Sequence, residues 1–255
     1  MKKLLYLLPV LAILFVACEK EENTTEGNGQ ENTGTPGSSD NSGNTGNSDS
    51  ISIPVGEAVD LGLSVKWANF NIGASEPEGY GLHFAWGETE LAEYYYWSIY
   101  KYCNGSKTTL TKYCNKSDYG NNGFVDNKTV LDPEDDVARV KWGGYWRMPT
   151  KSELDELRNE DNCTWTWTTL NGVYGYKVQS NKSGYTDNWI FLPAAGFLGA
   201  SDLVAGKYGG YWSCSLSTDN WGPDHACSIY FYSGYVDEHG SSYRYYGLSV
   251  RPVCP

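Results

Sequence analysis

Apolar residues recur at every second position in several stretches after residue 50, and this period restricts those stretches to β-strands. Between residues 61 and 67, leucine, valine and tryptophan alternate with small or polar residues. Successive side chains of a strand point to opposite faces, so the apolar set shares one face. Residues 80–86 and 189–192 also predict strands. The globular part is therefore expected to fold around sheets.

Two stretches break this period and predict short helices. Residues 133–141 begin with a proline and three acidic residues, which favour the positive N-terminal end of a helix. Thr150 and Glu153 form a capping box, and leucines at helical spacing after it predict a second helix that ends near Asn159. The fold class expected from these elements is α+β, with mixed antiparallel sheets, two short helices and long irregular loops.

The C-terminal third combines apolar alternation with many tyrosines. On a predicted strand over residues 227–232, Cys227, Ile229 and Phe231 would face the core, and the residues between them would face outward. A last strand would turn Tyr246, Leu248 and Val250 inward. Tyrosine, serine, asparagine and aspartate are the residues that recognition loops favour. A tyrosine-rich surface without a ligand, or tyrosines that pack on neighbouring strands, is the alternative. The candidate ligand-binding residues are Asp219, Asn220, Asp224, His225, Tyr230, Tyr232, Tyr235, Asp237, His239, Tyr243 and Tyr245.

Charge and motifs exclude several classes of function. The net charge of −12 repels the nucleic-acid backbone, so no nucleic-acid partner is expected. Neither a nucleophile elbow nor a glycine-rich phosphate loop is present. The acidic run from Asp132 to Asp136 lacks the ligand spacing of a calcium loop. We therefore expect no catalytic residue, no metal and no cofactor.

Six cysteines follow Cys18, and their spacing does not predict a zinc site. None lies in a pair separated by two residues, and the three histidines are scattered. Disulfides are allowed outside the cell. A bridge between Cys103 and Cys114 would close a short polar loop, and Cys214 with Cys227 could pair across two strands. The sequence leaves both bridges open.

The N-terminus predicts export and a lipid anchor. Residues 1–17 read as a signal peptide, because the apolar run is shorter than the about 20 residues that span a bilayer. The four residues from Phe15 to Cys18 resemble the lipobox of bacterial lipoproteins, in which the cysteine is lipidated; the alternative is an ordinary signal with an incidental cysteine. Residues 18–50 are then a tether poor in apolar residues, and residues 51–255 form one domain.

Six segments of the domain occur together in one known family. They read VDLGLSVKWA from Val59, FAWGET from Phe84, WRMPT from Trp146, FLPAAG from Phe191, YWS from Tyr211 and GLSVRPV from Gly247. From Glu57 to Val253 the chain resembles the Fibrobacter succinogenes major paralogous domain family of Bacteroidetes surface lipoproteins. The resemblance implies a C-type-lectin-like fold of the formylglycine-generating-enzyme type, in which the closing strand pairs near the start of the domain.

The resemblance also implies a function. Some members are similar to the variable target proteins of diversity-generating retroelements, whose displayed residues are rewritten by adenine-directed mutagenesis. Enzymes with this fold use a cysteine pair, but relatives mostly carry serine where this chain has Cys214. We therefore expect a recognition protein and no enzyme, since fold alone does not transfer function. It would be lipid-anchored in the cell outer membrane and bind a protein or glycan at the cell surface. A non-variable structural or adhesin-type paralogue and an enzyme acting on extracellular polymer are the alternatives.

Overall fold

The computed structural model describes residues 53–199, 205–237 and 240–255. The predicted signal peptide, Cys18, the tether and His239 lie outside these residues. Among the helices of the described residues, none has both the length and the apolar character needed to cross a membrane.

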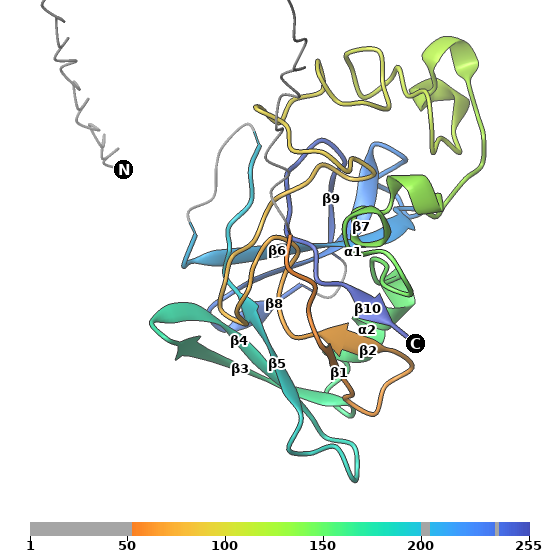
Figure 1. Ribbon diagram of the computed structural model, residues 1–255. Coiled ribbons are helices and arrows are strands. Elements are labelled where there is room, and N and C mark those ends of the chain that lie inside the picture. The colour runs from red at the N-terminus through yellow and green to blue at the C-terminus, as the bar shows by residue number, and fades with distance from the viewer. Residues whose placement is uncertain (1–52, 200–204, 238–239) are drawn as a thin grey trace, which may run out of the picture. The chain divides into compact units, whose positions relative to one another are not determined.

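The described residues form three sheets of antiparallel strands, joined by long loops (Figure 1). The first sheet contains β1 (Ala58–Val59), β2 (Lys66–Ala68) and β10 (Val253–Cys254). The second contains β3 (Cys163–Leu170), β4 (Val173–Ser180) and β5 (Trp189–Pro193). The third contains β6 (Tyr208–Leu216), β7 (His225–Tyr232), β8 (Tyr235–Val236) and β9 (Ser241–Tyr243). With α1 (Val137–Trp142) and α2 (Lys151–Arg158) the protein is α+β, and β10 pairs with β2 near the start of the domain, as expected.

The two helices differ in how well the sequence predicted them. The capping box at Thr150 is present, and α2 ends at Arg158 with Asn159 as its C-cap, which confirms the second helix. The first prediction is wrong in its extent: a single 3-10 turn over Pro133–Asp135 precedes α1, and Asp136 between them is extended. The Asp136 carboxylate accepts the N–H groups of Ala138, Arg139 and Met148. Asp136 is therefore the N-cap of α1, and one longer helix over the predicted range does not form.

The strands 189–192 and 227–232 are confirmed, whereas three other predicted strands are wrong. Over residues 61–67 only β2 forms, because Gly62 has a φ of +70° and its N–H binds the Asp60 side chain in a turn. Leu61 and Trp67 are nevertheless buried. Residues 80–86 and 246–250 run beside each other, joined at one bridge between Phe84 and Leu248. Their apolar residues thus signal burial and not regular strands.

The β6–β7 ribbon lies between two clusters of buried side chains. Trp212 and Ala226 belong to one cluster, and Tyr211, Ile229 and Phe231 belong to the other. Ser228 was expected to face outward, but it is buried because the second face of the ribbon is also covered. Cys227, Ile229 and Phe231 are buried as expected.

The β3–β4 hairpin was not predicted, although its sequence carries the signals. Threonine and tryptophan alternate along β3, and Asn171-Gly172 forms the turn with both residues at positive φ. Leu170 and Val173 pair on either side of that turn. The hairpin packs on β7 through Trp165, Trp167 and Tyr176, whose rings contact Phe231. It thereby forms one wall of the site described next.

Candidate ligand-binding site

Three neighbouring strands place a row of tyrosines at one end of the β6–β7 ribbon. The register pairs Tyr232 of β7 with Tyr208 of β6 on one side and with Tyr235 of β8 on the other. The rings of Tyr232 and Tyr235 stack with centroids 5.0 Å apart, and Tyr230 stacks on Tyr208 at 6.0 Å. On the opposite face of the ribbon Gly209 makes room for Phe231, because a Cβ at that position would lie 2.2 Å from the Phe231 ring.

An aromatic groove of about 580 Å³ lies beside this row. Tyr208, Tyr230 and Tyr232 form one wall. Trp167 of β3 and Tyr174 of β4 line it as well, with rings nearly parallel at 11°. The hydroxyl of Tyr176 donates to the Tyr232 carbonyl at 3.1 Å and so fixes β4 to the end of β7. Aromatic grooves with a few polar groups are the usual form of ligand sites.

The groove is largely uncharged. Among the lining residues that the structure describes, Lys207 alone is charged, and its ammonium lies 5.0 Å from the centroid of the Tyr208 ring. Burial and the neighbouring tyrosines raise the pKa of Tyr230 to about 12, so this phenol is neutral at physiological pH. The hydroxyls of Tyr208, Tyr230 and Tyr232 bind no other described residue. They are thus available to a ligand as donors and acceptors.

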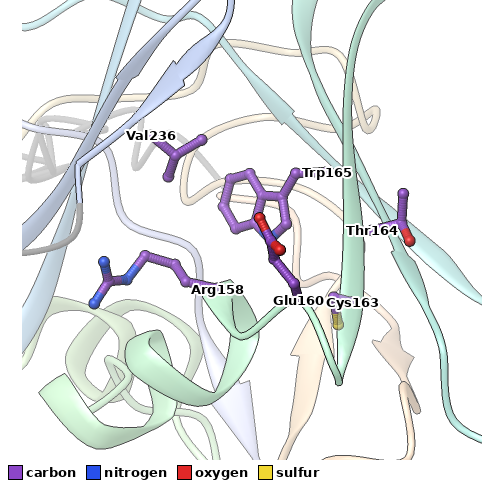
Figure 2. A pocket seen from close by; sticks show the side chains of 6 residues that line it. All are labelled: Arg158, Glu160, Cys163, Thr164, Trp165 and Val236. Carbon is purple, nitrogen blue, oxygen red and sulfur yellow. The ribbon is translucent and has the colours of Figure 1, made fainter.

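A second pocket of about 490 Å³ opens at the other end of β3 (Figure 2). Arg158 and Glu160 come from the end of α2 and the loop after it, and Trp165 points from β3 toward Val236. Arg158 donates to the Asp155 carboxylate at 2.5 Å and to the Asp237 carbonyl at 2.7 Å. The charge of Arg158 is thus compensated, whereas no described cation pairs with the exposed carboxylate of Glu160.

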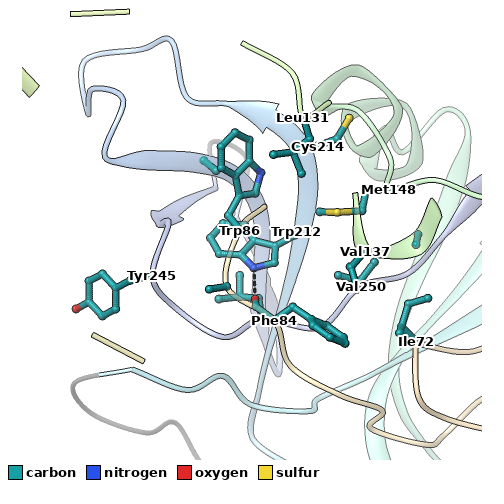
Figure 3. Close-up of a cluster of buried hydrophobic side chains, with 14 of the residues drawn as sticks. Ile72, Phe84, Trp86, Leu131, Val137, Met148, Trp212, Cys214, Tyr245 and Val250 are labelled. Carbon is teal, nitrogen blue, oxygen red and sulfur yellow. Dashed lines mark hydrogen bonds between the residues drawn. The ribbon is translucent and has the colours of Figure 1, made fainter. Parts of the chain in front are cut away.

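Three of the candidate ligand-binding residues are buried, so the expectation that they are exposed is wrong. Asp224 is 1% exposed, and its carboxylate lies 3.1 Å from Nδ1 of the buried His225. Tyr245 is 8% exposed and belongs to the buried cluster drawn in Figure 3. Alternation misled here, because the rings of Trp97 and Tyr246 pack on Tyr245 and the ring of Tyr243 packs on His225. These three side chains stabilise the fold.

The remaining described candidates lie at both ends of β7. Tyr230, Tyr232, Tyr235 and Asp237 are exposed or half-buried near the groove. Asp219 and Asn220 are exposed at the far end, where Asp219 accepts from Ser217 and from the Trp221 N–H in a turn. Tyr243 is half-buried there and lies 4.1 Å from the His225 ring.

Ring contacts connect the two ends of β7 through two residues that the sequence did not assign to the site. Phe197 contacts Tyr230 and stacks on Tyr246, and Tyr246 contacts Tyr243. The aromatic band is therefore continuous, but its middle is half-buried. Tyr208, Trp167, Tyr174 and Lys207 also escaped prediction; the threonine and tryptophan alternation of β3 and the strand entry at Lys207 were the available signals.

Neither open disulfide forms, because the six cysteines in the described residues are free thiols. The thiol of Cys103 donates to the Trp97 carbonyl and that of Cys114 to the Lys116 carbonyl. Burial raises the pKa of Cys214 to about 12 and that of Cys227 to about 11, so both are protonated and unreactive near neutral pH. In the described part of the chain no group of three histidine, cysteine or acidic side chains could hold a metal ion.

Comparison with known proteins leaves the function to the geometry. No family model, no curated protein and no solved structure matches the chain.

Proposed function

We propose that the chain is a surface-displayed recognition lipoprotein with a C-type-lectin-like domain, which binds a protein or glycan through the tyrosine row and the aromatic groove beside it. One observation carries this proposal: the hydroxyls of Tyr208, Tyr230 and Tyr232 surround a groove without binding another described residue. Exposed tyrosines offer a rigid ring and a polar tip at low entropic cost, which suits recognition.

Contacts with other strands hold in place the end of β7 that carries the tyrosine row. Phe231 is fully buried beneath it, and the Tyr176 hydroxyl holds the Tyr232 carbonyl. A rigid scaffold of this kind tolerates changes in the exposed rings, as the proposed variable target proteins require. We propose that diversification rewrites the exposed and half-buried positions between residues 219 and 243, whereas the buried side chains among them preserve the scaffold. Sequencing this locus in isolates of one strain tests the point, since changes outside these residues or no changes at all would favour the non-variable paralogue.

The binding experiment uses cells that display the full chain. The double variant Tyr208→Ser/Tyr232→Ser removes two rings that line the groove, and Tyr145→Ser is the matched control because Tyr145 is 80% exposed and does not line the groove. Adherence to a glycan array and to immobilised surface proteins should be lost in the double variant and kept in the control. Unchanged adherence of the double variant would remove the groove from the proposed function.

The lipid anchor is tested separately. Cys18→Ala should release the chain from the membrane fraction, because residues 4–17 are shorter than the about 20 apolar residues that span a bilayer. A mature, membrane-bound chain with an unmodified Cys18 thiol in mass spectrometry would contradict this part of the proposal.

A further inference from the structure

Within the described residues, strand β3 is an edge strand without the usual protection of an edge. It pairs with β4 on one side, and its sequence CTWTWTTL contains no charge and no proline. Natural sheets usually protect such an edge with charged side chains, proline, a bulge or a covering segment, because unpaired backbone groups recruit another strand. An eight-residue edge of threonine and tryptophan is therefore unusual.

The register shows which backbone groups of β3 point away from β4. The Tyr174 carbonyl and the Ser180 N–H bind the β5 side, so the alternate residues Gly175, Lys177 and Gln179 bind β3. Their partners in β3 are the threonines at 168, 166 and 164. In an antiparallel ladder the intervening residues then direct their N–H and C=O groups outward.

Trp165, Trp167 and Thr169 are these outward residues, and no other described residue binds their backbone groups on that side. The Cys163 N–H also points outward and binds the Asn159 carbonyl, which agrees with this register. The open edge consequently begins just after the end of α2 and extends toward the hairpin turn.

The two pockets described above flank this same edge. Trp165 lines the smaller pocket and Trp167 lines the aromatic groove. The two tryptophans are two residues apart, so they share one face of β3. A strand paired along the edge would direct alternate side chains, about 7 Å apart, to that face. Backbone pairing with pockets for alternate side chains is the pattern of recognition by strand addition.

Charge distinguishes between the occupants of this edge. Glu160 in the smaller pocket and Lys207 in the groove have no oppositely charged partner among the described residues. A second copy that paired through its own β3 would place only uncharged residues, 163–170, directly opposite the edge, whereas a separate partner segment can carry charges of its own at both ends. A partner segment with a basic residue near Glu160 and an acidic residue near Lys207 satisfies both.

We propose that β3 binds an extended segment of a partner protein by strand addition, with an aromatic or aliphatic side chain of that segment in the groove and oppositely charged residues near its two ends. This proposal deepens the proposed function, since the groove is common to both, and it commits the partner to protein. Backbone hydrogen bonds to β3 supply the affinity, and the two pockets supply the specificity for the sequence of the bound segment.

The test uses a phage library of peptides of about nine random residues, the length of a strand that matches β3, selected on the purified full chain. Thr169→Pro removes an outward N–H and leaves the β3–β4 ladder intact, and Thr169→Ala is the matched control. Selected peptides should bind Thr169→Pro about tenfold more weakly, the effect of one or two lost hydrogen bonds. They should bind Thr169→Ala within about twofold of the unchanged chain.

A second measurement keeps the proposal testable if Thr169→Pro does not fold. N-methylation of alternate residues in a selected peptide should abolish binding to the unchanged chain in one register and preserve it in the other, because only one set of N–H groups faces β3. If methylation of either set of alternate residues weakens binding equally, strand addition is wrong.

Three further results would overturn the proposal. They are recovery of no binding peptide, equal binding to Thr169→Pro, and a dimer in sedimentation that Thr169→Pro dissociates, which would make a second copy the occupant. If the selection fails while adherence still depends on Tyr208 and Tyr232, the proposed function stands and strand addition alone is wrong. If selected peptides bind but adherence does not depend on Tyr208 and Tyr232, strand addition stands and the proposed function of the groove is wrong.

Discussion

Two sets of tyrosines in this molecule differ in what their hydroxyls contact. Tyr100 and Tyr113 are buried, and their hydroxyls donate to the Trp86 carbonyl at 2.7 Å and to the Asp135 carboxylate at 2.6 Å. Beside the groove Tyr208 stacks on Tyr230 and Tyr232 stacks on Tyr235, and the hydroxyls of Tyr208 and Tyr232 bind no described residue. One residue type thus serves the fold where its polar tip is satisfied and remains available for recognition where it is not.

The buried set surrounds a buried cation. Arg244 is fully buried, and its guanidinium donates to the Tyr100 hydroxyl and to the carbonyls of Lys112, Tyr113 and Pro223. It also lies 5.0 Å from the Trp86 ring centroid. At the groove the corresponding cation is the exposed Lys207 over Tyr208. The two cation–ring contacts should therefore differ widely in their contribution to stability.

The largest effect is expected from Arg244→Met. The change leaves the buried carbonyls of Tyr113 and Pro223 and the half-buried carbonyl of Lys112 without a donor, and each unsatisfied buried group costs about 1–3 kcal/mol. The free energy of unfolding should fall by several kcal/mol, as urea denaturation would measure. Lys207→Met is the control and should stay within about 0.5 kcal/mol. Comparable losses in the two variants would contradict the distinction between the sets.

Tyr245→Ser should have the next largest effect. Tyr245 packs on Trp97 at 5.0 Å and on Tyr246 at 4.7 Å, and truncation of a buried aromatic side chain costs about 3–5 kcal/mol. Tyr232→Ser removes a ring that is 39% exposed and should cost about 0.5 kcal/mol. Thermal melting of the two variants compares them directly. If Tyr245→Ser melts at the temperature of the unchanged chain, Tyr245 is not a core residue and is again a candidate for ligand binding.

Removal of single hydroxyls sharpens the comparison further. The Tyr113 hydroxyl donates to Asp135 and accepts the Asp132 N–H, so Tyr113→Phe should cost about 1–3 kcal/mol. Tyr232→Phe loses no internal hydrogen bond and should leave the unfolding free energy unchanged, while it weakens ligand binding if the hydroxyl contacts the ligand. Equal unfolding free energies of the two variants in urea would show that an internal partner of the hydroxyl does not distinguish the two sets of tyrosines.

The smallest effects concern pH. Hydrogen bonds from Lys112 and Lys128 lower the pKa of Asp132 to about 2. Burial opposes ionisation of Asp135, but hydrogen bonds from Lys112, Tyr102 and Tyr113 hold its pKa below the ordinary value. Folding thus favours both carboxylates, so their contribution is present above about pH 4 and is lost as the pH falls toward 2. The melting temperature should fall over that window, and less so in Asp132→Asn.

The groove should not respond to pH near neutrality. Its lining residues are aromatic, small or cationic, and the pKa of Tyr230 is about 12. Binding measured between pH 6 and 9 should therefore stay constant. A binding midpoint inside that range would show that a group outside the groove contacts the ligand.

The sequence by itself determined several local elements. The capping box at Thr150 fixed the start of α2, and alternation identified β5, the strand over residues 227–232 and the buried positions Ile229 and Phe231. These features depend on neighbours in the chain, where period and capping chemistry act directly.

Only the tertiary structure decided which polar and aromatic residues face a ligand. Alternation assigns a residue to a face of a strand but does not say whether another element covers that face. Tyr245 is buried by the ring of Trp97 and His225 by that of Tyr243, and the register between β6 and β7 places Tyr208 opposite Tyr232. The groove itself needs Trp167 and Tyr174 from a hairpin far away in the chain. Contacts between such distant segments are set by packing, which no local pattern records.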